Sequence, residues 1–145
     1  MQVHKMTSPA HRAGRVPRHP EAFSHDLNPR RKRPRQENDA HLKFIRTLPC
    51  LCCGTRKNIQ AAHIRSASVV YGKRATGIGE KPDDKFSLPV CAAHHQQQHQ
   101  GNELAFWTAR GIDPFKIALA LWAAHGDEDA AELIVKTALV FQAAK

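Results

Sequence analysis

The pattern of hydrophobic and polar positions divides the chain into an N-terminal stretch without periodicity, a short mixed region and a helical C-terminal third. Residues 1–38 contain five prolines and many charged side chains, with no sustained apolar period. This composition indicates a disordered basic arm. The apolar content lies in residues 39–145, which we predict to form one domain because the chain has only 145 residues.

The C-terminal third has the start and stop signals of three successive helices. Residues 103–110 precede Gly111, a residue type that tolerates the left-handed conformation found at helix ends. Asp113 and Pro114 form a paired helix start, and Asp127 is a cap for a last helix. That helix carries apolar residues at helical spacing, namely Leu133, Ile134, Ala138 and Phe141. We expect this apolar face to pack on the rest of the domain or on a second subunit.

The middle of the chain predicts a strand, a long loop, a second strand and a helix. Residues 40–46 precede it as a short helix or turn, and residues 58–64 suit a first strand. Residues 66–85 are rich in Gly, Lys and Asp and indicate a loop. Residues 86–90 suit a second strand, and residues 91–100 have helical composition. The predicted fold class is therefore α+β.

The charge of the chain points to a polyanionic partner. The formal net charge is +9, and much of the excess lies before residue 36, where Arg30, Arg31, Lys32 and Arg33 form a basic run. Phosphate contacts supply sequence-independent affinity, so DNA or RNA is the simplest partner. A basic arm can bind phosphates even when it is disordered.

The sequence also predicts the redox state of the four cysteines. No apolar run approaches the roughly 20 residues that span a bilayer, and the polar, basic start of the chain lacks the apolar core of a signal peptide. We therefore expect a cytoplasmic protein without membrane contact, in which thiols stay reduced. A metal then explains the cysteines better than disulfides do.

Four positions have the spacing of a closed tetrahedral zinc site. Cys50 and Cys53 are separated by two residues and followed by glycine, and Cys91 and His94 follow about forty residues later. Cys52 is a competing ligand. We prefer Cys50 and Cys53, because two intervening residues suit a knuckle turn. The structural alternative is four buried thiols without a metal.

Three further histidines surround this predicted zinc site. On an ideal helix, His95 and His99 project in nearly the same direction, from a face next to that of Cys91 and His94. A pair at this spacing can present two imidazoles to one ion, but polar surface residues in a Gln-rich helix are an equal alternative. His63 alone is more often a hydrogen-bonded core residue than a catalytic one.

Several motifs in order carry a resemblance to a known family. They are Cys-x-x-Cys-Gly at 50–54, Ala-His-Ile-Arg at 62–65, Gly-x-Gly-x-Lys-Pro-x-Asp at 77–84, and Leu-Pro-x-Cys-x-x-His-His-x-x-x-His at 88–99. This order resembles the HNH (His-Me finger) nucleases, and more narrowly the prophage-encoded branch related to the recombination enhancement factor Ref. The resemblance covers roughly residues 40–125.

The resemblance implies a small ββα-metal core, stapled by the structural zinc and extended by the C-terminal helices. It makes His63 the general base and His95 a ligand of a catalytic divalent ion, with His99 as a second ligand. The ion would be Mg²⁺ or Mn²⁺, with Zn²⁺ as an alternative. Most members have an Asp or His before the base, and that side chain binds the ion. This chain has Ala62 there, and Asp84 is a candidate replacement.

The activity that the resemblance implies is hydrolysis of DNA phosphodiester bonds, in phage or prophage DNA processing or recombination. Arg65 is a candidate catalytic phosphate clamp, and Lys73, Arg74 and Lys81 are candidate backbone contacts. Such contacts do not read bases, so we expect little sequence specificity. A recombinase filament or another phage DNA-processing protein is a candidate partner. The alternatives are a zinc-stapled DNA-binding protein without catalysis and an assembly protein.

Overall fold

The structure, a computed structural model, describes residues 34–144 and shows a mixed α+β domain. This agrees with the predicted class. Five α-helices, one 3-10 helix and two strands follow one another in these residues. In chain order they are α1 (Asp39–Thr47), β1 (Ile59–His63), η1 (Asp84–Phe86), β2 (Ser87–Cys91), α2 (Ala92–His99), α3 (Glu103–Ala109), α4 (Pro114–Ala123) and α5 (Glu128–Ala143).

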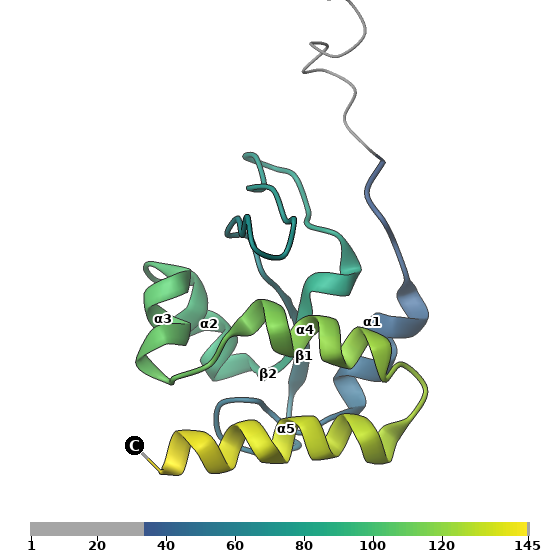
Figure 1. Cartoon of the computed structure of the whole chain (residues 1–145), viewed down its shortest axis with the longest axis vertical. Helices are drawn as coiled ribbons and strands as arrows, with labels where there is room; N and C mark the ends of the chain where they lie inside the picture. The colour runs from purple at the N-terminus through teal and green to yellow at the C-terminus, as the bar shows by residue number, and fades with distance from the viewer. Residues whose placement is uncertain (1–33, 145) are drawn as a thin grey trace, which may run out of the picture. The chain divides into compact units, whose positions relative to one another are not determined.

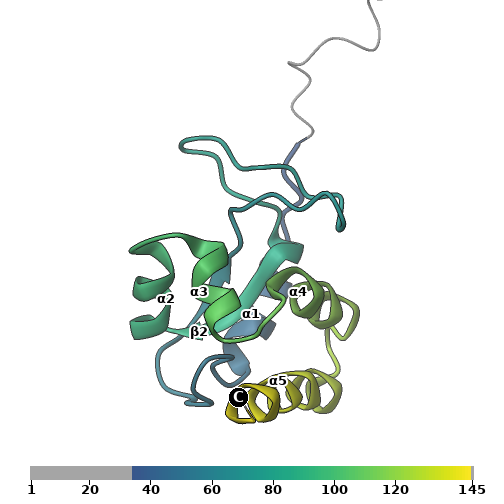
Figure 2. The ribbon, with the colours of Figure 1, turned by 60° about the vertical axis from the view of Figure 1, so that its left-hand side comes forward.

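The two strands form an antiparallel hairpin at the centre of the domain, in the predicted order of strand, long loop, strand and helix. The register pairs Ile59 with Cys91 and His63 with Ser87. Because β2 runs directly into α2, this register places the start of α2 beside the start of β1. Figure 2 shows α2 and α3 on one side of the hairpin, and α4 and α5 on the other.

Side-chain caps explain where the helices begin. Asp113 accepts hydrogen bonds from the amides of the first turn of α4, and Asp127 does the same for α5. Both caps were predicted. Asn38 and Asn102 cap α1 and α3 in the same way and were not predicted. Gly111, at φ +65°, takes the left-handed conformation expected at the end of α3.

The core joins the hairpin to the helices on both sides. Its fully buried side chains come from both strands, from the residue after β1 and from α1, α3, α4 and α5, and include Ile45, Ile64, Leu88, Trp107 and Leu121. Apolar burial of this kind is the main favourable term in folding. The hairpin is therefore held in place by packing from several helices.

Helix α5 packs part of the predicted apolar face on the domain. Ala131 and Val135 are buried, and Ile134 and Ala138 pack partly against the core. Leu133 and Phe141 are exposed and do not pack on the domain, so for these two residues contact with a second subunit stays a prediction. Successive residues turn by about 100° on a helix, so both point away from the stripe of Ala131 and Val135.

The domain begins earlier than the predicted boundary at residue 39. The segment before α1 is hydrogen-bonded to residues 82–84. The amide of Asp84 donates to the Gln36 carbonyl at 3.0 Å, and the Arg35 Nε donates to the Pro82 carbonyl at 2.9 Å. The predicted arm therefore contributes its last residues to the domain. Residues 1–33, with most of its basic side chains, lie outside the described part of the chain.

No helix within residues 34–144 has the length and apolar character needed to cross a membrane.

Candidate functional site

The structure brings the four predicted zinc ligands together. The ligand atoms of Cys50, Cys53, Cys91 and His94 all lie within 4.8 Å of one another. The Nδ1 of His94 is 3.1 Å from the Cys91 sulfur and 3.8 Å from the Cys50 sulfur. A tetrahedral zinc ion with Zn–S bonds of about 2.3 Å separates its ligands by roughly 3.3 to 3.8 Å. These residues can therefore hold a structural metal such as zinc.

The local environment favours a thiolate at Cys50. The neighbouring Cys52 side chain and then the backbone amides of Cys91 and Cys52 lower the pKa of Cys50, and together they outweigh its burial. The two amides lie 3.3 and 3.4 Å from the Cys50 sulfur. Cys52 has the opposite behaviour, because its contact with Cys50 and its burial raise its pKa. The thiolate is the form that binds metal, so these surroundings suit Cys50 as a ligand.

Backbone bonds fix this group against the hairpin. The amide of Gly54 donates to the Cys50 carbonyl at 2.8 Å and closes the knuckle turn. The amide of Leu51 donates to the Pro89 carbonyl of β2, also at 2.8 Å. Since β2 ends at Cys91, this bond fixes the position of the knuckle next to the start of α2.

A second group of histidines lies on β1 and α2. The Nε2 atoms of His95 and His99 are 2.9 Å apart, so the pair predicted from helical spacing does converge. The Nδ1 of His95 lies 2.5 Å from the side-chain oxygen of Gln60 on β1. This contact fixes the ring, because the carbonyl oxygen accepts the Nδ1 proton and leaves a lone pair on Nε2, which faces His99.

The surroundings of His95 favour its neutral form. Burial lowers the pKa of His95, and the nearby His99 and His63 lower it further. A neutral imidazole is the form that binds a metal ion. The influence of His63 also shows that the end of β1 lies close to the pair.

Asp84 is bound to His63 and does not join the pair on α2. Its Oδ1 is 2.8 Å from the His63 Nε2 and also accepts from the Arg35 guanidinium, while its Oδ2 accepts from the Asn38 amide at 2.7 Å. The carboxylate is only 1% exposed. Burial alone would raise the pKa of Asp84, but the bonds from Asn38, His63 and Arg35 together lower it.

The predicted ligand set for a catalytic ion is therefore not assembled. Within residues 34–144, the Cys50 group is the one set of three or more metal-ligand side chains close enough to share an ion. His95 and His99 offer two ligand atoms, and Asp84 is held elsewhere by its three hydrogen bonds. Ala62 is fully buried in the core and offers no ligand atom.

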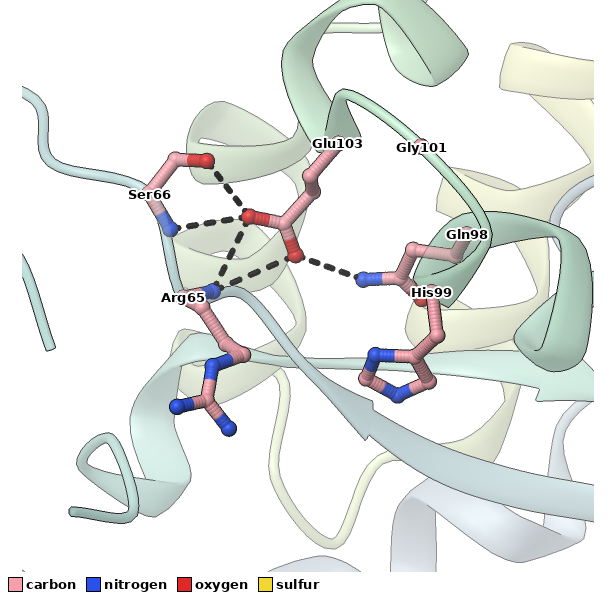
Figure 3. A pocket seen from close by; sticks show the side chains of 6 residues that line it. All are labelled: Arg65, Ser66, Gln98, His99, Gly101 and Glu103. Carbon is pink, nitrogen blue, oxygen red and sulfur yellow. Dashed lines mark hydrogen bonds between the residues drawn. The ribbon is translucent and has the colours of Figure 1, made fainter. Parts of the chain in front are cut away.

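A pocket of about 450 Å³ opens next to His99 (Figure 3). The residues that line it come from the segment after β1, from α2, from the turn after α2 and from α3; they are Arg65, Ser66, Gln98, His99, Gly101 and Glu103. Figure 3 shows the Glu103 carboxylate pointing at the Arg65–Ser66 backbone, with the Arg65 guanidinium and the His99 ring on the same side of it. The pocket thus combines a cation with a potential metal ligand.

Glu103 is the centre of a hydrogen-bond network behind this pocket. It accepts from the amide and hydroxyl of Ser66 at 2.8 and 2.6 Å, and from the Gln98 side chain at 2.7 Å. The same Gln98 nitrogen lies 3.3 Å from the His63 carbonyl. Glu103 and Gln98 thereby join α2 and α3 to the residues that follow His63. The hydrogen bonds from Ser66 and Gln98 offset the negative charge of the Glu103 carboxylate.

The candidate nucleic-acid contacts have different surroundings. Lys73 is buried, and its ammonium donates to three backbone carbonyls, so the prediction that it contacts a nucleic acid is wrong. Arg74 is exposed and paired with Glu80, while Arg65 and Lys81 are exposed. Arg30, Arg31, Lys32 and Arg33 lie outside the described residues. Arg65 lies two residues beyond β1, which ends at His63.

Sequence reasoning missed Gln60, Arg35, Gln98 and Glu103. Each acts through a contact with a residue that is distant in the chain or on another element, such as Gln60 with His95 and Arg35 with Asp84. Glu103 follows a capping Asn102, which signals a helix start but not a partner. No local pattern could have identified these four residues.

Comparison with known proteins places the chain in a family. The uncharacterized protein YdfU of Escherichia coli (strain K12) is 32% identical over 68 residues, which are 47% of this chain and 18% of that relative. The chain thus spans less than a fifth of the curated relative that it matches. No solved structure matches it. Residues 16–123 match the family described as a protein of unknown function (DUF968), and the chain belongs to this family.

Proposed function

We propose that the chain is a metal-dependent endonuclease of the HNH type that hydrolyses phosphodiester bonds in DNA. The observation that carries this proposal is the 2.8 Å contact between His63 and the buried carboxylate of Asp84, next to the converging pair of His95 and His99. A histidine oriented by a carboxylate, close to further histidines in a pocket with an arginine, is a typical arrangement for general-base hydrolysis.

His63 is the general base in this proposal. Asp84 accepts the Nε2 proton of His63, which leaves Nδ1 as the lone pair that takes a proton from water. The lowered pKa of Asp84 keeps it ionised, so the acceptor is always present at neutral pH. Asp84 therefore orients the ring and stabilises the imidazolium that forms, as a carboxylate does in other His–Asp pairs.

His95 and His99 are the residues that would hold the divalent ion. Bound there, such an ion supplies charge neutralisation at the phosphate and at the leaving oxygen. Gln60 fixes the tautomer of His95 in the way that outer partners orient metal-binding histidines. Two imidazole nitrogens suit Zn²⁺ and similar transition ions better than Mg²⁺, which prefers oxygen ligands.

Arg65 is the candidate phosphate contact. Its side chain is exposed and lines the pocket beside His99. A guanidinium can bind two phosphate oxygens at once. Glu103 lies in the same pocket, but the donors around it offset its charge, so it does not prevent an anion from entering. The pocket therefore fits the phosphodiester of a nucleic acid.

Cleavage of supercoiled plasmid and of circular single-stranded DNA tests the proposal, with Mg²⁺, Mn²⁺ and Zn²⁺ each tried. The variant is His63→Gln, whose amide can still donate to Asp84 but cannot serve as a base. We expect the wild type to cut and the variant to cut roughly 10²- to 10⁴-fold more slowly. The matched control is His125→Gln, which removes an exposed imidazole at the end of α4 and should cut like the wild type.

Equal rates for the wild type and His63→Gln would show that His63 is not the base. DNA binding without cutting by the wild type would favour a second candidate, a zinc-stapled DNA-binding protein without catalysis. One observation supports that alternative: Ala62 is buried and Asp84 is engaged, so only two ligand atoms remain for a catalytic ion. Fluorescence anisotropy with labelled DNA measures the binding separately.

A further inference from the structure

The loop between β1 and η1 exposes three aliphatic side chains. Val69 is 97% exposed, Val70 is 86% exposed and Ile78 is fully exposed. Single exposed aliphatic residues are common on protein surfaces, but three within ten residues form a distinct feature. Figures 1 and 2 show the loop, in teal, projecting beyond the helices at one end of the hairpin.

The first turn of the loop holds Val69 and Val70 at its tip. Ser68 and Lys73 exchange two backbone hydrogen bonds of 2.8 Å and close the turn around the two valines. The amide of Gly72 donates to the Val69 carbonyl at 3.2 Å, with Gly72 in the left-handed region at φ +62°. These bonds fix the backbone that carries both side chains.

Contacts at the base hold this turn to the domain. The Tyr71 hydroxyl donates to Asp113 at 2.6 Å, and its ring stacks on Phe115. The buried ammonium of Lys73 donates to the carbonyls of Ser66, Arg74 and Arg65 at 2.8, 3.2 and 3.3 Å. The buried Lys73 side chain therefore holds the backbone of this turn in place.

The second turn presents Ile78 in a similar way. The amide of Glu80 donates to the Gly77 carbonyl at 3.1 Å, and the Gly77 amide donates back to the Glu80 side chain at 3.1 Å. Glu80 also pairs with the Arg74 guanidinium. Each of the two turns thus carries an aliphatic tip on a backbone with several hydrogen bonds.

Both ends of the loop are fixed to the candidate active site. The loop starts at Arg65, two residues after His63, and its far end reaches Asp84, which contacts His63. Any molecule that contacts Val69, Val70 and Ile78, the aliphatic tips of the two turns, is consequently held at a defined position relative to His63. This connection ties the tips to the substrate rather than to a remote partner.

The charge and residue types of the loop favour a nucleic acid as the occupant. Residues 65–81 contain four basic side chains and one acidic one. Lys73 is buried and Arg74 pairs with Glu80, which leaves Arg65 and Lys81 as the exposed cations of the loop. The energetic centres of protein interfaces are usually Trp, Tyr or Arg, and Val is under-represented there. Proteins that bend DNA insert aliphatic side chains between base steps while arginine and lysine contact the flanking backbone.

We propose that Val69, Val70 and Ile78 form an apolar wedge that enters the minor groove of a DNA duplex and separates a base step next to the bond that is cut. Arg65 and Lys81 contact the phosphates on either side. The preferred substrate is then a duplex with a step that unstacks easily, such as a mismatch or a pyrimidine–purine step. This inference rests on the nucleic-acid function proposed above.

The test compares the wild type with the double variant Val69→Ser/Val70→Ser on a duplex that carries 2-aminopurine at a mismatched step. The fluorescence of 2-aminopurine rises when the base unstacks. We expect the wild type to raise the signal, and the variant to lose this rise and to bind at least about tenfold more weakly by anisotropy. The variant removes no packing contact, so its melting temperature should equal that of the wild type.

The matched control is Leu133→Ser/Val140→Ser on α5, which removes exposed aliphatic surface far from the loop in sequence. It should keep both the fluorescence rise and the affinity. If Val69→Ser/Val70→Ser also keeps both while the wild type cuts DNA, the wedge is overturned and the nuclease stands. If the rise is lost in this variant but the wild type never cuts, the wedge stands and the nuclease fails.

Two other outcomes also overturn the wedge. A wild type that binds no DNA removes the wedge together with the proposed function. A wild-type dimer that the loop variant converts to a monomer in analytical ultracentrifugation would assign the tips to a second copy of the chain.

Discussion

The Cys50 group and the histidine group share helix α2 but are organised in different ways. In the first, four ligand atoms from the knuckle and from α2 converge within 4.8 Å. In the second, His63 and His95 are each tied to an oxygen, of Asp84 and Gln60, and only two nitrogens converge. The first group is complete when a metal joins it, whereas hydrogen bonds already position the second.

This difference predicts opposite responses to perturbation. A site whose donors have few other partners depends on its metal for stability, because binding free energy becomes folding free energy. A site held by hydrogen bonds keeps its shape without the metal, and a perturbation there lowers catalytic activity and not stability. The predictions below separate these two behaviours, beginning with the largest expected effect.

Removal of the structural metal should unfold the domain. Apparent binding free energies of structural zinc are about 10–16 kcal/mol in small zinc domains, while whole domains are stable by about 5–15 kcal/mol. We therefore expect a strong chelator, or the Cys91→Ser substitution, to abolish the cooperative thermal transition seen by circular dichroism. Mass spectrometry of the native protein should find one zinc per chain before treatment and none afterwards.

The matched control for this prediction is Cys52→Ser. Cys52 lies beside the group but is not among its four members. We expect this variant to keep one zinc per chain and a transition close to that of the wild type. Loss of zinc from Cys52→Ser with retention in Cys91→Ser would contradict the assigned ligand set.

Asp84→Asn should affect chemistry more than structure. The amide keeps the size of the side chain but removes the charge that orients His63 and pairs with Arg35. We expect DNA cleavage to fall roughly 10²- to 10⁴-fold, in line with the contribution of an oriented base. The free energy of unfolding, measured in urea, should fall by roughly 1–3 kcal/mol, because the groups that donate to the Asp84 carboxylate then face a neutral amide.

The control for Asp84→Asn is Arg35→Gln, which leaves the contact of His63 with Asp84 in place. Arg35 is a quarter exposed, so water replaces part of its interaction. A smaller loss of cleavage is therefore expected for Arg35→Gln. Equal and full activity of Asp84→Asn would remove His63 and Asp84 as the catalytic pair.

The sequence was sufficient for the features that depend on local spacing. The knuckle spacing identified Cys50 and Cys53, and the caps and glycines identified the C-terminal helices, because each pattern acts within a few residues. The order of strand, loop, strand and helix also followed from local composition. These predictions needed no knowledge of how distant segments meet.

The features that failed depend on tertiary contacts. Lys73 looks like a surface cation in sequence, yet the return of its own loop buries it among backbone carbonyls. Asp84 looks like a free oxygen ligand, yet Arg35 and Asn38 reach it from residues almost fifty positions earlier. Neither contact has a local signal, so the sequence could suggest the residues but not their roles.

The two histidine pairs of the domain offer a further contrast. The Nδ1 atoms of His41 and His125 are 3.3 Å apart, similar to the separation in the pair of His95 and His99. His41, however, is fully buried between α1 and α4, its Nε2 has no partner, and Trp122 packs edge-on against its ring. We interpret His41 as part of the core, with the exposed His125 at its edge.

The burial of His41 predicts a loss of stability in acid. Burial, and then the proximity of His125, lower the pKa of His41 from 6.5 to about 4. Between these values the unfolded chain takes up a proton that the folded chain excludes, so falling pH favours unfolding. From pH 6.5 to 4, this residue should remove roughly 3 kcal/mol of stability, with no contribution to the pH dependence above pH 7.

Urea unfolding between pH 4 and 8 measures this effect, with His41→Phe as the variant. Phenylalanine fills the buried site without a titrating group, so the decline in stability below pH 6.5 should become shallower by about the amount assigned to His41. Equal slopes for the wild type and His41→Phe would show that other groups cause the acid sensitivity, and that burial does not distinguish the two histidine pairs.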